Sequence, residues 1–271
     1  MLACLIIAYA LALVIIPPAR DVMQRLGHVR SNYAGRLVPS SMGIPLVVSA
    51  ALASVAVAAA TGGGRASSVP CLLLVIAAML AGVVDDLFGS GEFRGFAGHA
   101  AALVKRGILT TGILKGIVIL TFAALAVSAA APALPPPVLV MDSAVVALAA
   151  NLSNLLDLRP GRAAKAYMAG AAALALATGL PGPALVPVGL AGAVLAGMKD
   201  DLAERSMLGD AGSNPLGAAL GYWLVLTTPV AVKAAVLVSL GLVHAYAERR
   251  SITAAIERNP LLRFLDNLGR R

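Results

Sequence analysis

Apolar runs of about twenty residues recur along the whole chain, and short polar stretches separate them. Each run is long enough to cross a bilayer core of about 30 Å as a helix. The pattern therefore predicts nine membrane-spanning helices, with turn residues such as Pro and Gly in the breaks between them. The predicted spans are residues 1–17, 42–60, 69–87, 112–131, 138–156, 163–180, 184–199, 212–229 and 230–247.

Composition supports a membrane protein. Of the 271 residues, 59% are hydrophobic and 13% are charged, whereas soluble domains are about 45–50% apolar and about 25% charged. We expect an all-α, polytopic transmembrane bundle, with one transmembrane domain over 1–247 and a basic cytoplasmic tail over 248–271. The first run lacks a basic leader and a cleavage site, so we expect a retained helix. Cys4 and Cys71 are too far apart to indicate a disulfide framework or a zinc site.

Charge is strongly asymmetric along this pattern. Five basic segments on one side of the predicted bundle, together with Lys115 at a helix end, hold 19 of the 21 Lys and Arg residues. Basic loops face the cytoplasm, so we expect a multi-pass plasma-membrane protein with its N terminus outside and its C terminus inside. The net charge of +8 fits contact with anionic lipid, and we expect no nucleic-acid partner. No internal repeat supports an inverted-repeat transporter.

Acidic residues gather on the same side. Asp85 and Asp86 end the third span, Asp157 ends the fifth and Asp210 opens the eighth; only Asp142 falls on the other side, where Asp142→Asn should be nearly silent. Single acids at helix ends are ordinary solvated residues, but an adjacent pair at the edge of the hydrocarbon repels and attracts a cation. Mg²⁺ is normally held by one or two carboxylates plus substrate phosphates. We therefore predict a Mg²⁺ site facing the cytoplasm, with Mn²⁺ as the alternative.

A second acidic pair, Asp200-Asp201, lies beside Lys199 and Arg205 in a polar loop. Its basic neighbours favour ordinary solvated residues over a second cation site.

Two amides precede Asp157 at helical spacing. Asn151, Asn154 and Asp157 are three residues apart and share one helix face. Buried amides need hydrogen-bond partners, so this face is either a structural ladder between helices or a polar wall that binds a sugar or phosphate. Three cations follow that could bind phosphate or simply reflect the basic-inside bias. They are Arg159, Arg162 and Lys165.

The segment around Asp210 combines glycines with a predicted helix start. Gly212 and Ser213 could let backbone N–H groups approach an anion, although an N-capping Asp would give the same pattern. The three histidines are too dispersed for a metal set. Among them, His99 lies in a Gly-interrupted basic stretch and could line the cleft, whereas His28 and His244 are interpreted as structural.

These motifs resemble a known family. VVDDLFG, NLSNLLDLRPGR and LGDAGSN, in that order and at helix ends, resemble the polyprenyl-phosphate N-acetylhexosamine-1-phosphate transferases (glycosyltransferase family 4). That superfamily includes phospho-N-acetylmuramoyl-pentapeptide transferase and the undecaprenyl-phosphate N-acetylglucosamine-1-phosphate transferases. NYAGRLVPSSMGIP resembles its early Pro-Met-Gly segment, and the similarity covers roughly residues 30–225.

The resemblance implies an enzyme that moves a HexNAc-type sugar 1-phosphate from a UDP-sugar to a polyprenyl phosphate, such as undecaprenyl phosphate. UMP is released, and the product serves cell-wall or surface polysaccharide synthesis. Family members form homodimers. The implied catalytic residues are Asp85, Asp86 and Asp157. The implied Mg²⁺ ligands are Asp210 and Asp86. The expected substrate-binding residues are Asn151, Asn154, Arg159, Arg162, Lys165, His99, Gly212 and Ser213.

The chain departs from the family pattern in three ways. Pro160 stands where the family has a second Asp, the His-rich loop is missing, and we count nine spans instead of ten or eleven. These departures indicate a distinct subgroup. Two alternatives stay open: an inactive homologue that serves as a scaffold, and a transporter of an anionic or lipid-linked solute. The sequence runs typical of two other lipid transferase classes are missing.

Overall fold

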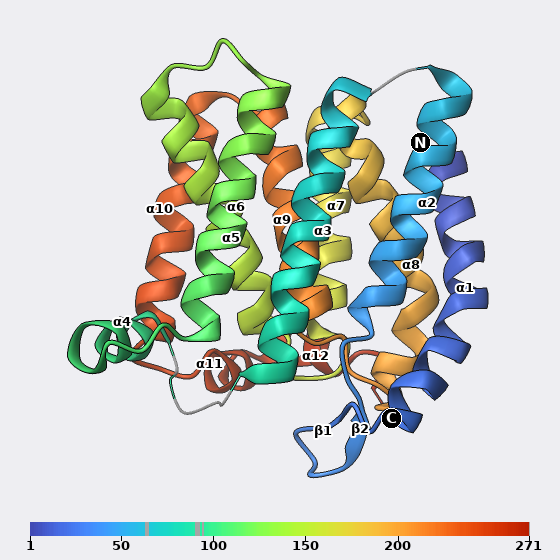
Figure 1. The fold of residues 1–271 in the computed structure, drawn as a ribbon, viewed down its shortest axis with the longest axis vertical. Coiled ribbons are helices and arrows are strands. Elements are labelled where there is room, and N and C mark those ends of the chain that lie inside the picture. Colours follow the sequence, from blue (N-terminus) through green and yellow to red (C-terminus); the bar gives the residue numbers. More distant parts are fainter. Residues whose placement is uncertain (63–64, 90–92, 94, 271) are drawn as a thin grey trace.

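The computed structural model describes residues 1–62, 65–89, 93 and 95–270. Within these residues, nine long helices lie side by side in a bundle (Figure 1). They are α1 (Leu2–Arg25), α2 (Gly43–Thr61), α3 (Arg65–Phe88), α5 (Thr111–Ala130), α6 (Pro136–Leu156), α7 (Arg162–Thr178), α8 (Leu185–Leu202), α9 (Asp210–Thr227) and α10 (Val230–Ala247). A 3₁₀ turn, η1 (Gly182–Ala184), precedes α8.

Each of the nine predicted segments overlaps one of these helices, but the predicted end of the first at residue 17 is wrong, because α1 continues through Pro17 and Pro18 to Arg25. Among the described residues, seven helical segments are long and apolar enough to cross a membrane, so the chain is a membrane protein. The two long helices outside this set are α7, which has 17 residues, and α9, which opens on polar residues. These polar residues face other helices instead of lipid, because α9 packs against α3 and α6 and Ser213 and Asn214 are 0% and 1% exposed.

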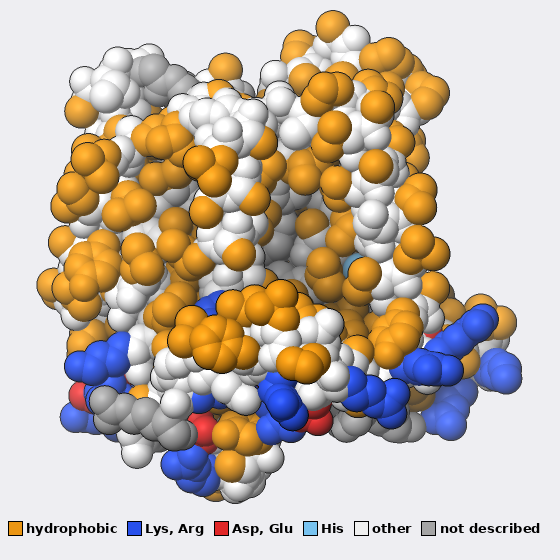
Figure 2. Space-filling view, turned by 180° about the vertical axis from the view of Figure 1, so that it is seen from behind, with side chains coloured by type: hydrophobic (Ala, Val, Ile, Leu, Met, Phe, Trp, Pro, Cys, Tyr) orange, Lys and Arg blue, Asp and Glu red, His pale blue; other side chains and the backbone are white. Residues whose placement is uncertain are grey.

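The charged end is the end of the bundle where the short elements lie. It carries α4 (Gly95–Arg106), α11 (Ile252–Arg258), α12 (Pro260–Asn267) and a small sheet, in which β1 (Val29–Ser31) pairs antiparallel with β2 (Leu37–Pro39) (Figure 1). Lys and Arg gather at the same end (Figure 2). The hairpin corrects the all-α prediction to nearly all-α. Strands of three residues are too short to leave a periodic signal.

Glycines allow the helices to meet at the N-terminus of α9. A Cβ on Gly43 would lie 2.0 Å from the Gly212 Cα atom, and a Cβ on Gly82 would lie 2.3 Å from the Asp210 carbonyl oxygen. Helices α2 and α3 therefore approach the backbone of α9 more closely than any side chain allows. Gly212, expected in a substrate-binding role, forms this helix–helix contact.

Far from the charged end, α6 and α10 share a buried ion pair. Lys233 donates to Asp142 at 2.8 Å, and their side chains are 7% and 0% exposed. The other carboxylate oxygen of Asp142 has no hydrogen-bond partner among the described residues. Asp142 is thus separated from the other acids, as its position in the sequence predicts, but it is not solvated.

We expect Gly43→Ala to lower the free energy of unfolding by about 1–3 kcal/mol, because the added methyl group overlaps the α9 backbone. Thermal unfolding in detergent measures the change. Gly241→Ala in α10 is the matched control, since nothing lies within 4 Å of its added Cβ. Equal stability of the two variants would contradict the close packing of α2 on α9.

We expect Lys233→Met to cost about 3–5 kcal/mol of stability, because it leaves the Asp142 carboxylate buried without a counter-charge. Combining it with Asp142→Leu should restore most of the loss. Thermal unfolding of both variants tests this, and a double variant as unstable as the single one would refute it. Asp142→Asn also leaves Lys233 unpaired, so the expectation of a nearly silent change does not extend to stability.

Candidate active site

Three helices bring charged side chains together at the charged end. Lys115 on α5 donates from Nζ to Asp85 Oδ2 on α3 at 2.6 Å, and also to Asp210 Oδ2 on α9. The lysine side chain is only 10% exposed. One buried ammonium therefore lies between two carboxylates and offsets their mutual repulsion. Sequence reasoning counted Lys115 only as a helix-end charge, although a lone Lys just inside an apolar span is itself a signal.

The amide face of α6 reaches the same cluster. Asn154 donates from Nδ2 to Asp210 Oδ2 at 3.2 Å, and the Ser213 hydroxyl donates to the Asn154 amide oxygen at 3.4 Å. Asn214 adds a hydrogen bond of 2.8 Å from its amide to the Asp210 carbonyl oxygen. The structure therefore brings together Asn154, Asp210 and Ser213, which the sequence named as separate candidate site residues. Asn151 lies one turn further from the charged end and is half-buried.

Asp86 faces a different set of partners from its neighbour Asp85. Its Oδ1 accepts the Asp210 N–H at 3.0 Å, and its Oδ2 accepts the Ala211 N–H at 3.1 Å and the Ser41 hydroxyl at 2.6 Å. Only 6% of Asp86 is exposed. A carboxylate at this position caps α9 from another helix and complements the positive end of its dipole. Asp86 thereby sets the position of Asp210.

Ser41 links Asp86 to the segment before α2. Its backbone φ is 58°, which is unusual for a residue other than glycine. The residue is fully buried. His28 Nε2 lies 2.8 Å from the Ser41 hydroxyl. Because this hydroxyl donates to Asp86, His28 acts as the donor to it. His28 therefore supports the cluster from a distance, in agreement with its structural interpretation.

Asp157 follows the last turn of α6 and is half-buried near the same acids. Burial raises the pKa of Asp157 well above its usual range, and the carboxylates of Asp201, Asp210 and Asp86 add to this effect. The backbone N–H of Gly209 acts in the opposite direction by stabilising the ionised form. Asp157 therefore keeps its proton to a higher pH than an exposed aspartate does.

A cavity of about 320 Å³ opens beside the cluster. Its polar side is formed by Arg30, Asp85, Asp86, His99, Thr110, Thr111 and Asp210. Its apolar side is formed by Phe88, Phe93, Ile108 and Leu109. His99 was predicted to line the cleft, and it does so with Nδ1 2.8 Å from the Thr110 hydroxyl. The cavity thus offers both charged and apolar surface to a ligand.

Arg30 reaches the cavity from β1, and sequence reasoning missed it. Its guanidinium donates to the Asp86 carbonyl oxygen. The hairpin that carries it is fastened to Glu204, which accepts from Asn32 at 3.1 Å, from the Tyr33 hydroxyl at 2.6 Å and from Arg36. The Tyr33 hydrogen bond is the main reason that the pKa of Glu204 falls below its usual value. In the sequence Arg30 is one of several loop arginines, so only the fold distinguishes it.

All three cations predicted to bind phosphate have protein partners instead. Arg162 forms a bidentate pair with Asp266 on α12, with distances of 2.8 and 2.9 Å. Lys165 donates to three carbonyl oxygens near the end of α12, including that of Leu265 at 2.9 Å. The third, Arg159, lies over the Tyr33 ring at 4.5 Å. These residues fasten the hairpin and the C-terminal segment to the bundle.

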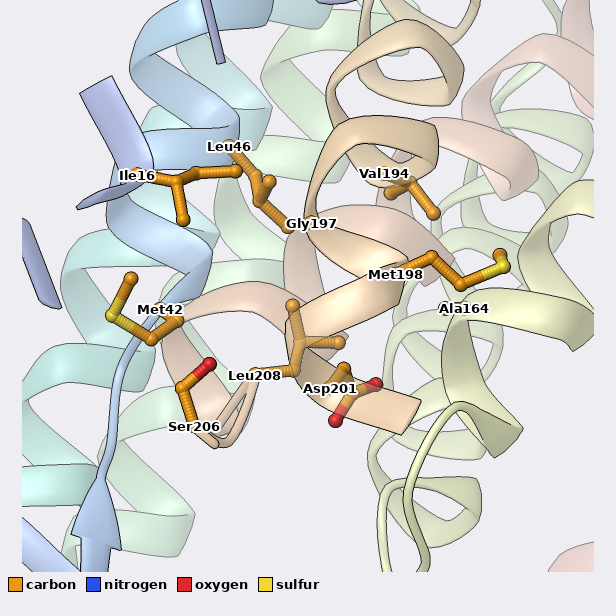
Figure 3. A pocket seen from close by; sticks show the side chains of 10 residues that line it. All are labelled: Ile16, Met42, Leu46, Ala164, Val194, Gly197, Met198, Asp201, Ser206 and Leu208. Carbon is orange, nitrogen blue, oxygen red and sulfur yellow. The ribbon is translucent and has the colours of Figure 1, made fainter. Parts of the chain in front are cut away.

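The second acidic pair is divided between two environments. Asp200 pairs with Arg20 at 2.8 Å and with Arg205 at 2.5 Å, and its side chain is only 17% exposed. Asp201 accepts the Gly161 N–H at 2.9 Å and borders a mainly apolar cavity of about 20 Å³ (Figure 3), which is room for about one water. Both acids therefore have protein partners and are only partly solvated.

Among the described residues, no group of three or more His, Cys, Asp or Glu side chains could hold a metal ion. Asp85 and Asp210, which share the Lys115 ammonium, still supply two hard oxygen ligands. Because Mg²⁺ commonly uses one or two carboxylates and completes its shell with substrate phosphates and water, this donor set fits a metal that arrives with the substrate.

Comparison with known proteins adds no relative: no protein-family model matches the chain, and no curated protein matches its sequence.

We expect Asp266→Asn to loosen the C-terminal segment, because it weakens the charged hydrogen bonds from Arg162. Despite the opposing effect of burial, Arg162 and Arg270 hold the pKa of Asp266 below its usual value, so the pair is fully charged at neutral pH. Limited proteolysis should cleave the segment after α10 several-fold faster than in the parent. Asn267→Ala is the control, and equal cleavage rates in all three proteins would contradict the docking role.

Proposed function

We propose that the protein is a Mg²⁺-dependent phosphoglycosyl transferase of the plasma membrane, with its active site facing the cytoplasm. It transfers a HexNAc-type sugar 1-phosphate from a UDP-sugar to a polyprenyl phosphate and releases UMP. The observation that carries the proposal is the convergence of Asp85, Lys115, Asn154 and Asp210, from four helices, beside one cavity at the charged end.

The cluster is suited to phosphoryl transfer. Asp85 and Asp210 would hold Mg²⁺, and the metal would supply positive charge to a donor diphosphate. Asp86, expected as a Mg²⁺ ligand from the sequence, is replaced by Asp85 in this proposal because both Asp86 oxygens accept hydrogen bonds from Ser41 and the start of α9. Lys115 lies between the two carboxylates, and its ammonium would bind a phosphate oxygen of the substrate. An acceptor phosphate oxygen would then attack the sugar-bearing phosphorus, and the bond to the UMP oxygen would break. Asp85 lines the cavity and would orient the acceptor phosphate and take its proton.

The two sides of the cavity fit an amphipathic acceptor. A phosphate would lie against the carboxylate cluster, His99 and Arg30, while a hydrocarbon chain would follow Phe88, Ile108 and Leu109. Phe88 is 72% exposed and Leu109 is 58% exposed. Such apolar surface beside a polar site supports a lipid substrate, because the chain of a polyprenyl phosphate stays in the membrane.

The departure at Pro160 is compatible with an active enzyme. The Pro160 carbonyl oxygen accepts a hydrogen bond of 2.9 Å from Arg270, and Gly161 binds Asp201 through its N–H. This part of the motif therefore attaches the C-terminal segment and contributes no residue to the Asp85–Lys115–Asp210 cluster. A subgroup could change it without losing the carboxylates that the reaction needs.

The test is UMP release by purified protein with undecaprenyl phosphate, Mg²⁺ and a panel of UDP-sugars. We expect Asp210→Asn and Lys115→Met each to lower kcat by about 10²–10³, because each removes charge that the transition state needs. Removing Mg²⁺ with a chelator should stop turnover. Asp200→Asn is the matched control, since this acid lies at the same end but contacts Arg20 and Arg205.

Full activity in both site variants would refute the assignment. Folded parent protein that is silent across the panel would instead favour an inactive scaffold. Uptake of an anionic solute into vesicles, without UMP release, would favour a transporter.

A further inference from the structure

Helix α12 turns its apolar side away from the protein. Leu261 is 65% exposed, Phe264 63%, Leu265 47% and Leu268 54%, whereas Asp266 is only 8% exposed. At helical spacing the four apolar residues share one face. A helix on the water-exposed surface of a protein has the opposite arrangement, with its apolar face toward the core. The medium that surrounds α12 must therefore be one that accepts apolar side chains.

The orientation of α12 is fixed by strong contacts on its inner side. Asp266 receives bidentate hydrogen bonds from Arg162 and again from Arg270, at distances of 2.7–3.0 Å. Lys165 binds the carbonyl oxygens of Leu265 and Leu268 at the end of the helix. Because these contacts involve charged groups, they are stronger than ordinary hydrogen bonds. The helix cannot rotate to bury its apolar face without breaking them.

The surroundings of α12 indicate what covers this face. At the charged end, apolar side chains adjoin the apolar sides of the long helices and are bordered by Lys and Arg (Figure 2). The C-terminal segment that includes α12 also exposes four arginines: Arg249, Arg250, Arg258 and Arg263. An apolar face with a basic border is complementary to the headgroup region of an anionic membrane.

We propose that α12 is an interfacial helix, which lies in the plane of the membrane with Leu261, Phe264, Leu265 and Leu268 among the upper acyl chains. The exposed arginines bind the phosphates of anionic lipids beside it. This inference does not depend on the proposed reaction. Arg162 and Lys165 in the first turn of α7 bind α12. Membrane binding of α12 therefore also restrains the loop at residues 158–161, directly after Asp157.

Site-directed fluorescence tests the proposal in the complete chain. Cys4 and Cys71, the buried free cysteines, are replaced by Ala, and an environment-sensitive fluorophore is attached at Leu265→Cys. Asn267→Cys on the opposite side of the same helix is the matched control. The proteins are reconstituted into phosphatidylcholine vesicles with and without phosphatidylglycerol. Quenching by acyl-chain spin-labelled lipid is compared with quenching by aqueous iodide.

We expect lipid-borne quencher to reduce the emission at residue 265 about twofold or more, while iodide acts mainly at residue 267. Phosphatidylglycerol should increase protection of residue 265 from iodide, and Arg258→Gln with Arg263→Gln should cancel that increase. Quenching of residue 265 by iodide alone would overturn the proposal. Protection from both quenchers, with disulfide cross-linking between two Leu265→Cys chains, would assign this face to a second copy and would also overturn it. Fluorescence quenching does not depend on turnover, so the result stands even if the protein does not release UMP.

Discussion

The arrangement of the site depends on the buried carboxylate of Asp86. It accepts hydrogen bonds from two backbone N–H groups at the start of α9 and from the Ser41 hydroxyl. An acid on α3 therefore caps α9, whose own N-cap residue, Gly209, has no side chain to do so. Hydrogen bonds to a charged group contribute about 1.5–3 kcal/mol each. Because Asp210 is the first residue of α9, the same contacts that hold this helix against α2 and α3 also determine where the Asp210 carboxylate points.

Charge balance explains why the cluster can lie at the edge of an apolar bundle. Asp85 and Asp210 would repel each other without Lys115, and the lysine would be costly to bury without them. An arrangement with one ammonium and two carboxylates keeps a net negative charge, which suits a site that receives a divalent cation. The buried Asp142–Lys233 pair follows the same rule far from the charged end, but there one cation meets one carboxylate and α6 is joined to α10.

The polar groups at the charged end divide into two sets with separate tasks. One set, around Asp85, lines the cavity, and the other fastens the hairpin and the C-terminal helices to the bundle. Arg162 and Lys165 are instructive here, because their sequence context indicated phosphate binding, yet they hold α12 through Asp266 and backbone carbonyl oxygens. Arg30 shows the opposite case. Its sequence context is that of an ordinary loop arginine, yet it lines the cavity. The sequence around a motif therefore shows which residues are basic, but it does not identify the groups that they bind.

The sequence by itself determined the helical segments and the grouping of acids at one end, because hydropathy and helix-end position are local properties. It also named Asn154 and Asp210 as candidate site residues, but not their contact with each other. The tertiary structure decided the rest: which carboxylate of the Asp85-Asp86 pair faces Lys115, which one caps α9, and which side of α12 faces outward. Those choices arise from contacts between residues distant in the chain, and no local pattern of hydrophobic and polar positions encodes them.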